Sequence, residues 1–336
     1  MKNMKRIVWW LFLLALPLIT GLICLGMGRY SLSLTESFHV LLKHFFHLGE
    51  GVSRQAVTVV VNMRLPRVLI AMLCGAGLAI AGICLQSIFA NPLVSPDTIG
   101  VASGASFGAA IALAVGVNLW LVQWSALLFG LAALALTYFV STTKGERTTI
   151  MLVLSGLVIS SLFQAGVSLI KYVVDTEERL PAITYWLMGS LSNTTYRSLL
   201  VCFPFIIVSM IVVYLLRWKT NLLMLSEDEA RSLGINVARL RLLLILASTF
   251  ITAAVVSVCG QIGWVGLLIP HVSRMLFGNN NQKAIPAAIS LGATFLVVID
   301  TMARTLISSE IPISILTAVI GAPCFIFLLK RTGGNW

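Results

Sequence analysis

Four charged residues beside long apolar runs are the first candidates for chemistry in this sequence. Arg64 and Arg67 stand just before one apolar run, and Asp300 and Arg304 stand at the end of another. Charged side chains close to hydrocarbon are costly, so we expect these groups to pair with one another or to face a partner. The i, i+4 spacing of Asp300 and Arg304 allows an ion pair on one helix face.

The histidines and cysteines do not form a recognisable metal or redox centre. His39, His44 and His47 share one loop without a cysteine or clustered carboxylates, so solvated histidines are favoured over a metal site. His271 follows a proline in an apolar segment, where a structural histidine is favoured over a proton relay. No C-x-x-C pair occurs among the six cysteines, which are expected to be small core or lipid-facing residues: Cys24, Cys74, Cys84, Cys202, Cys259 and Cys324.

The motifs of nucleotide and zinc chemistry are missing as well. The sequence contains no G-x-x-x-x-G-K-[ST] phosphate loop and no H-E-x-x-H pair. We therefore predict that the chain is not an enzyme and carries no catalytic residue, cofactor or metal of its own. A membrane-embedded enzyme is the weakest of the alternatives, because no cluster of nucleophile, base and metal ligand is visible.

A short polar segment between two apolar runs has the signals of a deliberate helix. Ser226 and Glu229 have the spacing of a capping box, and Glu227 and Asp228 fall in the first turn, where the helix dipole favours anions. Gly234 suits the left-handed position that ends a helix. The segment is too short to span a bilayer. It is either an ordinary capped loop helix or a rigid knob that docks into a soluble partner.

Two further segments combine prolines or glycines with membrane depth. The stretch 91–97 holds Pro92 and Pro96, which force extended or turned backbone. Irregular backbone at membrane depth persists only where protein or a water-filled cavity surrounds it, which favours a pore constriction here. The stretch 260–271 holds three glycines that permit close helix approach, and Pro270 interrupts its hydrogen-bond ladder.

The elements that must position these residues are membrane-spanning helices. Of the 336 residues, 58% are hydrophobic and only 10% are charged, and the mean hydropathy is +0.98. This composition predicts an all-α polytopic membrane protein with a single domain over 1–336. A short outer half-helix is expected near 181–191, and an uncleaved first helix is favoured over a signal peptide. The ten expected spans lie near 7–27, 67–89, 98–116, 118–140, 150–171, 198–216, 242–259, 263–277, 285–303 and 312–329.

The distribution of basic residues predicts the orientation. With both termini in the cytoplasm, 14 of the 23 Lys and Arg residues fall on the inner side, as the positive-inside rule requires. The net charge of +11 is thus explained by orientation, and no nucleic-acid partner is expected. The polar segment within 219–240 then lies in the cytoplasm.

Taken together, these motifs resemble the FecCD-type permeases of type II ABC importers, which serve iron–siderophore, haem and cobalamin uptake. The resemblance is clearest from Arg64 to Leu329. It departs from the usual pattern at Trp264, at Ser314 and in the loop 279–282. The matching segments are Arg64–Arg67, Gln86 with Asn91–Leu93, Gly100 with Ser103–Ala105, Trp186–Ser190, Val265–His271 with Arg274, Asp300–Arg304, Glu310–Pro312 and Gly321–Pro323.

The resemblance implies an assembly and a set of roles. A second permease copy or close paralogue, two ATPase subunits that bind ATP and Mg, and a periplasmic or lipid-anchored binding protein would surround this chain in the inner membrane. Residues implied in coupling to the ATPase are Glu227, Asp228, Glu229, Ala230, Arg231, Leu233 and Gly234. An inner gate is implied at Asn91, Pro92 and Leu93, with a second part at Thr148 and Thr149. Docking of the binding protein is implied at Arg64, Arg67 and Arg304.

The substrate is left open by the sequence. An iron–siderophore is the first expectation and haem or cobalamin the next, while a small metal oxyanion such as molybdate or tungstate is an alternative. A secondary transporter is a remote alternative, since it would need carboxylates along an intramembrane path and only Asp300 is a candidate.

Overall fold

The computed structural model describes residues 2–30, 32–46, 53–142, 149–225 and 227–332, and within these ranges the chain is built from helices. Seven helical stretches are long and apolar enough to cross a membrane, and three shorter apolar helices accompany them. These ten correspond one to one with the ten predicted spans. They are α1 (Lys2–Gly26), the stretch Arg54–Ile88 that ends in α4 (Leu65–Ile88), α5 (Val101–Val115), α6 (Leu119–Val140), α7 (Thr149–Val173), α9 (Tyr196–Leu216), α11 (Val237–Cys259), α12 (Val265–Phe277), α13 (Asn281–Thr305) and α14 (Ile313–Thr332).

The smaller elements lie in the connections. The predicted half-helix is α8 (Arg179–Leu187), and the cytoplasmic segment forms η3 (Lys219–Met224) and α10 (Glu227–Ser232). A further short turn, η2 (Pro96–Ile99), precedes α5.

The outer stretch 28–63 is more helical than the sequence analysis assumed. It contains α2 (Leu34–Phe46), and α3 (Arg54–Val57) and η1 (Thr58–Arg64) run directly into α4. The helix starts early because the Ser53 side chain accepts a hydrogen bond from the Ala56 backbone N–H, at 3.1 Å. Val40 of α2 is buried against Val60, so this outer part has a small core of its own.

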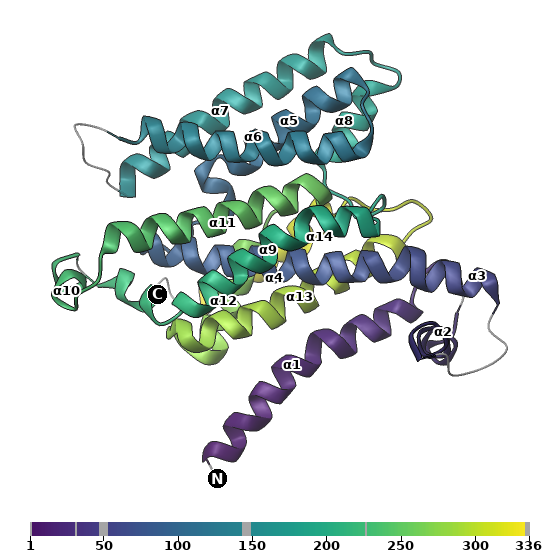
Figure 1. Ribbon diagram of the computed structural model, residues 1–336, viewed down its shortest axis with the longest axis horizontal. Coiled ribbons are helices and arrows are strands. Elements are labelled where there is room, and N and C mark those ends of the chain that lie inside the picture. The colour runs from purple at the N-terminus through teal and green to yellow at the C-terminus, as the bar shows by residue number, and fades with distance from the viewer. Residues whose placement is uncertain (1, 31, 47–52, 143–148, 226, 333–336) are drawn as a thin grey trace.

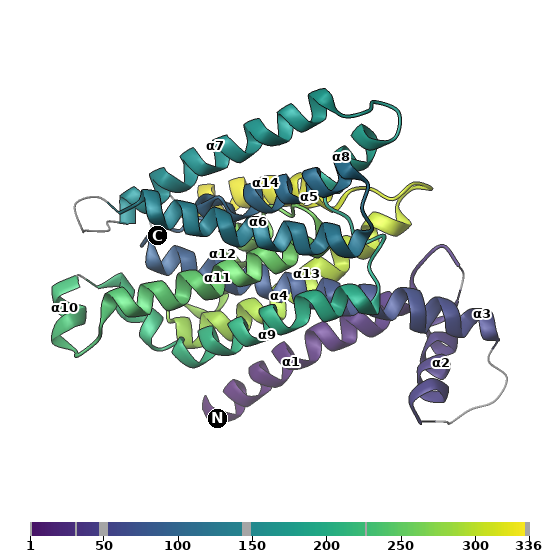
Figure 2. The same cartoon turned by 45° about the horizontal axis from the view of Figure 1, so that its top comes forward.

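The helices form two groups around a buried centre. Figure 1 shows α5, α6, α7 and α8 stacked on one side and α4, α9, α11, α12 and α13 on the other, and Figure 2 shows the same stack from a second angle; α14 contacts α12 and α13. In α4 and α11, 83% and 78% of the most apolar window is buried, against 22% in α1, so α4 and α11 form the centre and α1 the edge. The contacts of α1 are mainly with α13.

Glycines allow the central helices to touch backbone to backbone. A Cβ on Gly82 of α4 would overlap the carbonyl of Gly266 on α12, and a Cβ on Gly75 would overlap the carbonyl of Gly292 on α13. The close approach predicted for the stretch 260–271 is therefore confirmed at Gly266. Helices in a bilayer associate through such close packing, because lipid tails are as apolar as the helix side chains and the hydrophobic effect does not favour helix contacts over lipid contacts.

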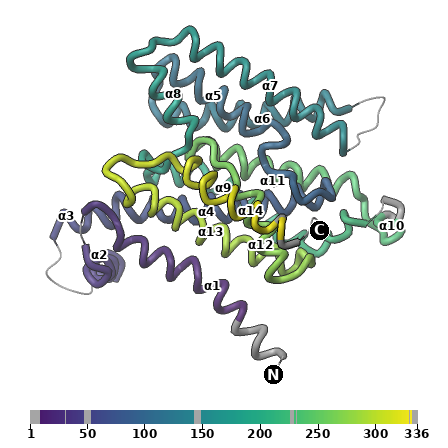
Figure 3. The backbone as a smooth tube through the Cα atoms, turned by 180° about the vertical axis from the view of Figure 1, so that it is seen from behind, coloured from purple at the N-terminus to yellow at the C-terminus, as the bar shows by residue number. Residues whose placement is uncertain are grey.

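The two ends of the molecule carry different elements. The N-terminal end of α1, the C-terminal end of α14 and α10 lie toward one end, and α2 and α3 lie at the other (Figures 1 and 3). The predicted orientation assigns the end that carries α10 to the cytoplasm.

Candidate translocation path and coupling surface

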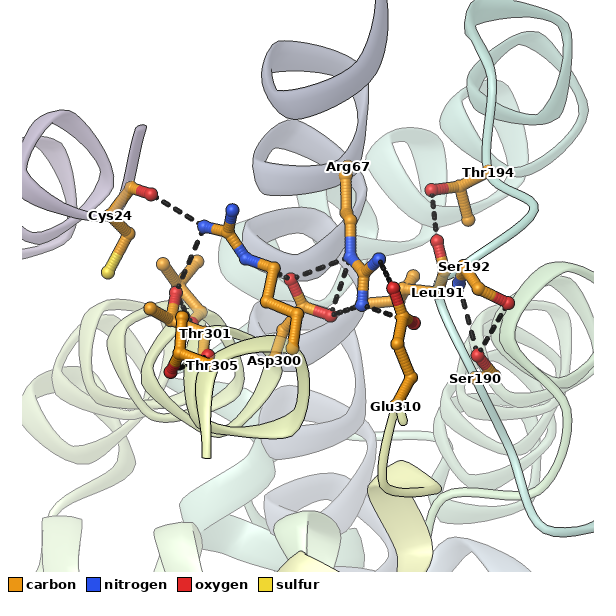
Figure 4. A network of polar contacts seen from close by, with 12 residues as sticks. Cys24, Arg67, Ser190, Leu191, Ser192, Thr194, Asp300, Thr301, Thr305 and Glu310 are labelled. Atoms are coloured by element: carbon orange, nitrogen blue, oxygen red, sulfur yellow. Dashed lines mark hydrogen bonds and ion pairs between the residues drawn. The ribbon is translucent and has the colours of Figure 1, made fainter. Parts of the chain in front are cut away.

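The charged residues at the outer end form one buried network. Arg67 on α4 donates from Nε and Nη2 to the carboxylate of Asp300 on α13, at 2.8–3.0 Å. The other edge of its guanidinium donates to both carboxylate oxygens of Glu310, at 2.9 and 3.1 Å. Figure 4 shows Arg67 clamped between the two acids. The Arg67 and Asp300 side chains are only 11% and 1% exposed. The network therefore joins the outer ends of α4 and α13 by a buried ion pair.

Two more arginines hold the end of α1. Arg64 donates to the carbonyl oxygens of Leu25 and Tyr30, at 2.8 and 2.6 Å. Arg304 donates to the Met27 carbonyl at 2.6 Å. The last carbonyls of a helix have no intrahelical donor and form the negative end of its dipole, so a guanidinium satisfies them in both respects.

These contacts change the interpretation of the three arginines. The resemblance to FecCD-type permeases implies that Arg64, Arg67 and Arg304 pair with carboxylates of a binding protein. In the structure all three are largely buried, and each donates to groups of this chain. The expected pair between Asp300 and Arg304 is confirmed, with 3.8 Å between Nε and Oδ2. Sequence alone could not foresee the carbonyl partners, because they come from distant segments.

The predicted inner gate is a tight turn after α4. The Asn91 backbone N–H donates to the Gln86 carbonyl at 3.1 Å, and the Asn91 side-chain oxygen accepts from the Leu93 N–H at 2.9 Å. Ala90 has a φ of +46°, which non-glycine residues adopt rarely. Asn91 and Leu93 are exposed at the cytoplasmic end, and Pro92 is half-buried. The backbone of the turn is thus fixed by hydrogen bonds, while the apolar side chain of Leu93 is exposed.

The gate turn is fastened to its neighbours on two sides. Gln86 accepts a hydrogen bond from Arg274 on α12, which ties the end of α4 to that helix. On the other side, Gly156 lets α7 pack against the backbone of Thr98 in η2. Thr149 is half-buried in the first turn of α7, and Thr148 lies outside the described residues.

Asp97 is the acidic residue of this turn. It lies in η2, between the spans α4 and α5. Burial raises the pKa of the Asp97 carboxyl to about 6. Its protonation therefore changes near neutral pH rather than near pH 4.

The cytoplasmic helix α10 ends as the sequence predicts. Gly234 has a φ of +76°, and the Ile235 N–H donates to the Ala230 carbonyl at 3.4 Å, the pattern of a Schellman cap. Leu233 is 59% exposed, whereas Ala230 is 1% exposed and packs into the core. Ala230 is therefore a fastening point and Leu233 faces outward. Ser226 of the predicted capping box lies outside the described residues, and for Glu227, Asp228 and Arg231 only the backbone is described.

A polar face of α7 was missed by the sequence analysis. Ser161, Gln164, Ser168 and Lys171 follow one another at helical spacing, and the first three are exposed. The Ser161 and Ser168 hydroxyls donate to carbonyls of their own helix, at 2.9 and 3.0 Å, so the Gln164 amide is the group in the middle of this span that suits lipid least. The spacing of three, four and three residues was the available signal.

The outer end of this face opens into a polar cavity of about 390 Å³. Lys171, Thr184, Gln261, Trp264 and Ser314 line it, so it draws on α7, α8, α14 and the connection between α11 and α12. No carboxylate is among its lining residues. The cavity can therefore accept an anion or a hydrogen-bonding solute.

Trp264, one of the departures from the family pattern, has an unusual backbone at this cavity. Its φ is +70°, and its side chain packs against Gly321 of α14. Such strain persists only where the surroundings enforce it, and here the side chain is held between the cavity and Gly321 and Phe325 of α14.

The remaining candidate residues show no catalytic or metal site within the described ranges. His39 and His44 are exposed, and His47 lies outside those ranges. His271 is buried with its ring against Phe325. The stretch Gly104–Gly108 has the G-x-S-x-G spacing, but it lies inside the helix α5 rather than on the strand-to-helix turn that a nucleophile elbow needs. No group of three His, Cys, Asp or Glu residues fits a metal ion in the described part of the chain.

Comparison with known proteins decides the family. The family model of the FecCD transport family matches residues 15–331. The chain belongs to the FecCD transport family. This FecCD chain is 46% identical to the molybdate import system permease protein MolB of Haemophilus influenzae, with 95% of both chains covered. It is 40% identical to a proposed iron chelatin transport system permease of Helicobacter pylori, over 94% of this chain and 96% of that one.

A solved structure supports the same assignment. It is described as an inward-facing conformation of a proposed metal-chelate type ABC transporter, and it is 43% identical with a TM-score of 0.87. The alignment covers 96% of this FecCD chain and 98% of that chain. The protein is thus the permease of an ABC importer and a multi-pass protein of the inner membrane.

Proposed function

We propose that this FecCD permease imports an anionic, metal-containing solute by alternating access. The observation that carries the proposal is the cavity at the outer end of α7. Lys171 is the charged residue of its lining, amide and hydroxyl groups make up most of the polar remainder, and no carboxylate is present. A cation would find no counter-charge there, whereas an anion would.

Molybdate is the first substrate to test. The 46% identity to a molybdate permease over nearly the whole chain supports it, and a small oxyanion fits the polar lining. A ferric chelate is the second candidate, because the relative at 40% identity is assigned to iron chelatin transport. This order reverses the expectation from sequence. Haem and cobalamin follow these two.

The assembly we propose has two copies of this chain. In α7, only 28% of the most apolar window is buried, and the exposed part includes the polar face. A second copy facing α7 and α14 would enclose this face and form the path. A periplasmic or lipid-anchored binding protein would deliver the solute. In this scheme Arg64, Arg67 and Arg304 support docking indirectly, by fixing the outer ends of α1, α4 and α13.

Two ATPase subunits would drive the cycle from the cytoplasmic side and bind ATP and Mg there. We place their contact on Glu227 to Gly234, with Leu233 as the exposed apolar anchor and Ala230 as the inner support. The exposed Met224 and Leu225 extend this surface. Movement of α10 would reach the gate at Asn91, Pro92, Leu93, Thr148 and Thr149 through η3 and the ends of α4 and α7.

Reconstitution into liposomes tests the proposal. The permease, its ATPase and its binding protein are combined, and ATP-dependent accumulation of radiolabelled molybdate and of ferric chelates is measured separately. Molybdate accumulation is expected. Uptake of a ferric chelate but not of molybdate would show that the substrate is a ferric chelate, and the assignment as an importer permease would stand. Uptake that continues without the ATPase would contradict the ABC mechanism.

The coupling surface is tested in the same vesicles. Leu233→Asp should abolish uptake and weaken ATPase binding, because it places a charge on an apolar contact. Arg239→Gln, an exposed change nearby, serves as the matched control. Full uptake by Leu233→Asp would remove α10 from the proposed interface.

A further inference from the structure

A groove on the cytoplasmic half of the molecule is not used by the transport mechanism. It has a volume of about 600 Å³ and lies between α1, α9 and α13. Figures 1 and 2 show α1 leaving the bundle toward its N-terminal end, on the side of α9 and α13. The residues that line it fall into a polar mouth and an apolar interior.

The mouth of the groove is basic and aromatic. Arg217 and Lys283 line it together with Trp10 and Tyr214. The Arg217 guanidinium lies 4.0 Å from the centre of the Tyr214 ring, and its Nη1 donates to the Tyr214 carbonyl at 2.7 Å. Among the described residues neither Arg217 nor Lys283 forms a salt bridge with a carboxylate. The mouth therefore holds two positive charges without an internal counter-ion.

The interior of the groove is apolar and runs toward the middle of the membrane. Leu13, Leu14, Pro17, Ile289 and Ala293 line it. Ten residues of α13 separate Lys283 from Ala293, a rise of about 15 Å. A hydrocarbon core is about 30 Å thick, so the groove spans one leaflet from the headgroup level inward.

The groove is a built feature, because α1 is fastened on both sides of it. Pro17 has no N–H, so it leaves the Leu13 carbonyl without its helical donor. Ser290 of α13 donates its hydroxyl to that carbonyl. Farther toward the N-terminus, Trp9 packs edge-on against Phe277, with 5.9 Å between ring centres. The N-terminal half of α1 is thereby fastened to α12 and α13.

We propose that this groove binds one anionic phospholipid of the cytoplasmic leaflet. Its phosphate would lie at Arg217 and Lys283, and an acyl chain would follow the apolar walls of α1 and α13. A basic pocket between transmembrane helices on the cytoplasmic side suits such a headgroup. Trp10 and Tyr214 lie at the depth where amphipathic rings are favoured. A soluble anion would use the mouth but leave the apolar interior empty.

Lipid retention by the purified full-length chain tests the proposal. The protein is equilibrated with phosphatidylglycerol, cardiolipin or phosphatidylcholine in mild detergent, and the bound lipid is counted by native mass spectrometry. Wild type should retain one anionic lipid per chain and little phosphatidylcholine. Each charge removed should weaken retention about fivefold, and the double variant Arg217→Gln/Lys283→Gln about thirtyfold.

Matched variants distinguish lipid binding in the groove from a general effect of positive surface charge. Lys219→Gln/Arg239→Gln removes two exposed charges that do not line the groove, one of them close to Arg217, and should leave retention unchanged. Ala293→Phe fills the interior with both charges intact and should also lose the lipid; its thermal unfolding is compared with wild type. Equal loss in both double variants, equal retention of phosphatidylcholine, or displacement of the lipid by millimolar inorganic phosphate would overturn the proposal.

Discussion

At the residue scale, the buried charges of this permease act within the chain. Arg67 uses both edges of its guanidinium, one on Asp300 and one on Glu310. Such a group cannot be removed without leaving two acids behind in a site that water reaches poorly. Substitution of Arg67 should therefore lower the stability of the fold, whereas substitution of an exposed docking residue would lower only the affinity for the binding protein.

We predict that Arg67→Gln lowers the stability of the folded protein by about 3 kcal/mol, because the buried Asp300 carboxylate then keeps only the longer contact with Arg304, at 3.8 Å. Thermal unfolding of the detergent-solubilised chain measures the loss. Arg29→Gln, an exposed change at the outer end, should have little effect. Unchanged stability of Arg67→Gln together with weaker binding-protein affinity would place Arg67 in the docking surface instead.

Asp97 predicts a pH dependence. Its folded-state pKa of about 6 lies above its ordinary value, so the fold prefers the neutral carboxyl. The contribution of Asp97 to the free energy of unfolding should therefore be greatest below about pH 4 and should be lost as the pH rises through about 6, by up to about 3 kcal/mol. Asp97→Asn should flatten this part of the stability curve in thermal unfolding between pH 4 and 8. An unchanged slope would show that Asp97 does not titrate as described.

At the element scale, glycine contacts set how closely α4 meets its neighbours. Gly82 faces the backbone of Gly266, where no side chain can move aside to make room. By contrast, Gly263 has nothing within 4 Å of the position of an added Cβ. The two glycines therefore make a matched pair for a substitution test.

We expect Gly82→Ala to destabilise the protein by about 1–3 kcal/mol, because the added methyl group forces α4 and α12 apart. Gly263→Ala should be close to neutral. Thermal unfolding compares the two variants with wild type. A neutral Gly82→Ala would mean that α12 shifts freely against α4.

At the scale of the whole molecule, the polar face of α7 is the wall that we propose for the aqueous path. We predict that cysteines introduced at Ser161, Gln164 or Ser168 react with a membrane-impermeant maleimide in the assembled importer. The background is Cys324→Ala, since the other five cysteines are buried. Leu200→Cys on α9, at a side chain that is 70% exposed, should face lipid and stay unlabelled. Equal labelling at both places would argue against a path along α7.

The sequence by itself determined the number and order of the spans and predicts their orientation. Apolar runs, breaker residues and the inward excess of basic residues are local signals, and each is read without knowledge of the neighbours. The same holds for the end of α10, where Gly234 is the left-handed residue that a cap requires. The family followed from motifs of this kind.

Only the tertiary structure decided which residues meet. Arg64 and Arg304 donate to the carbonyls of Leu25 and Cys24 in α1, which lie far away along the chain, so sequence alone could not show that their charges are used within the chain. The lipid groove likewise depends on Pro17 and Ser290, which are brought together from α1 and α13. In a membrane protein almost every helix face is apolar, so hydrophobic periodicity carries little information about partners, and side-chain packing makes the choice.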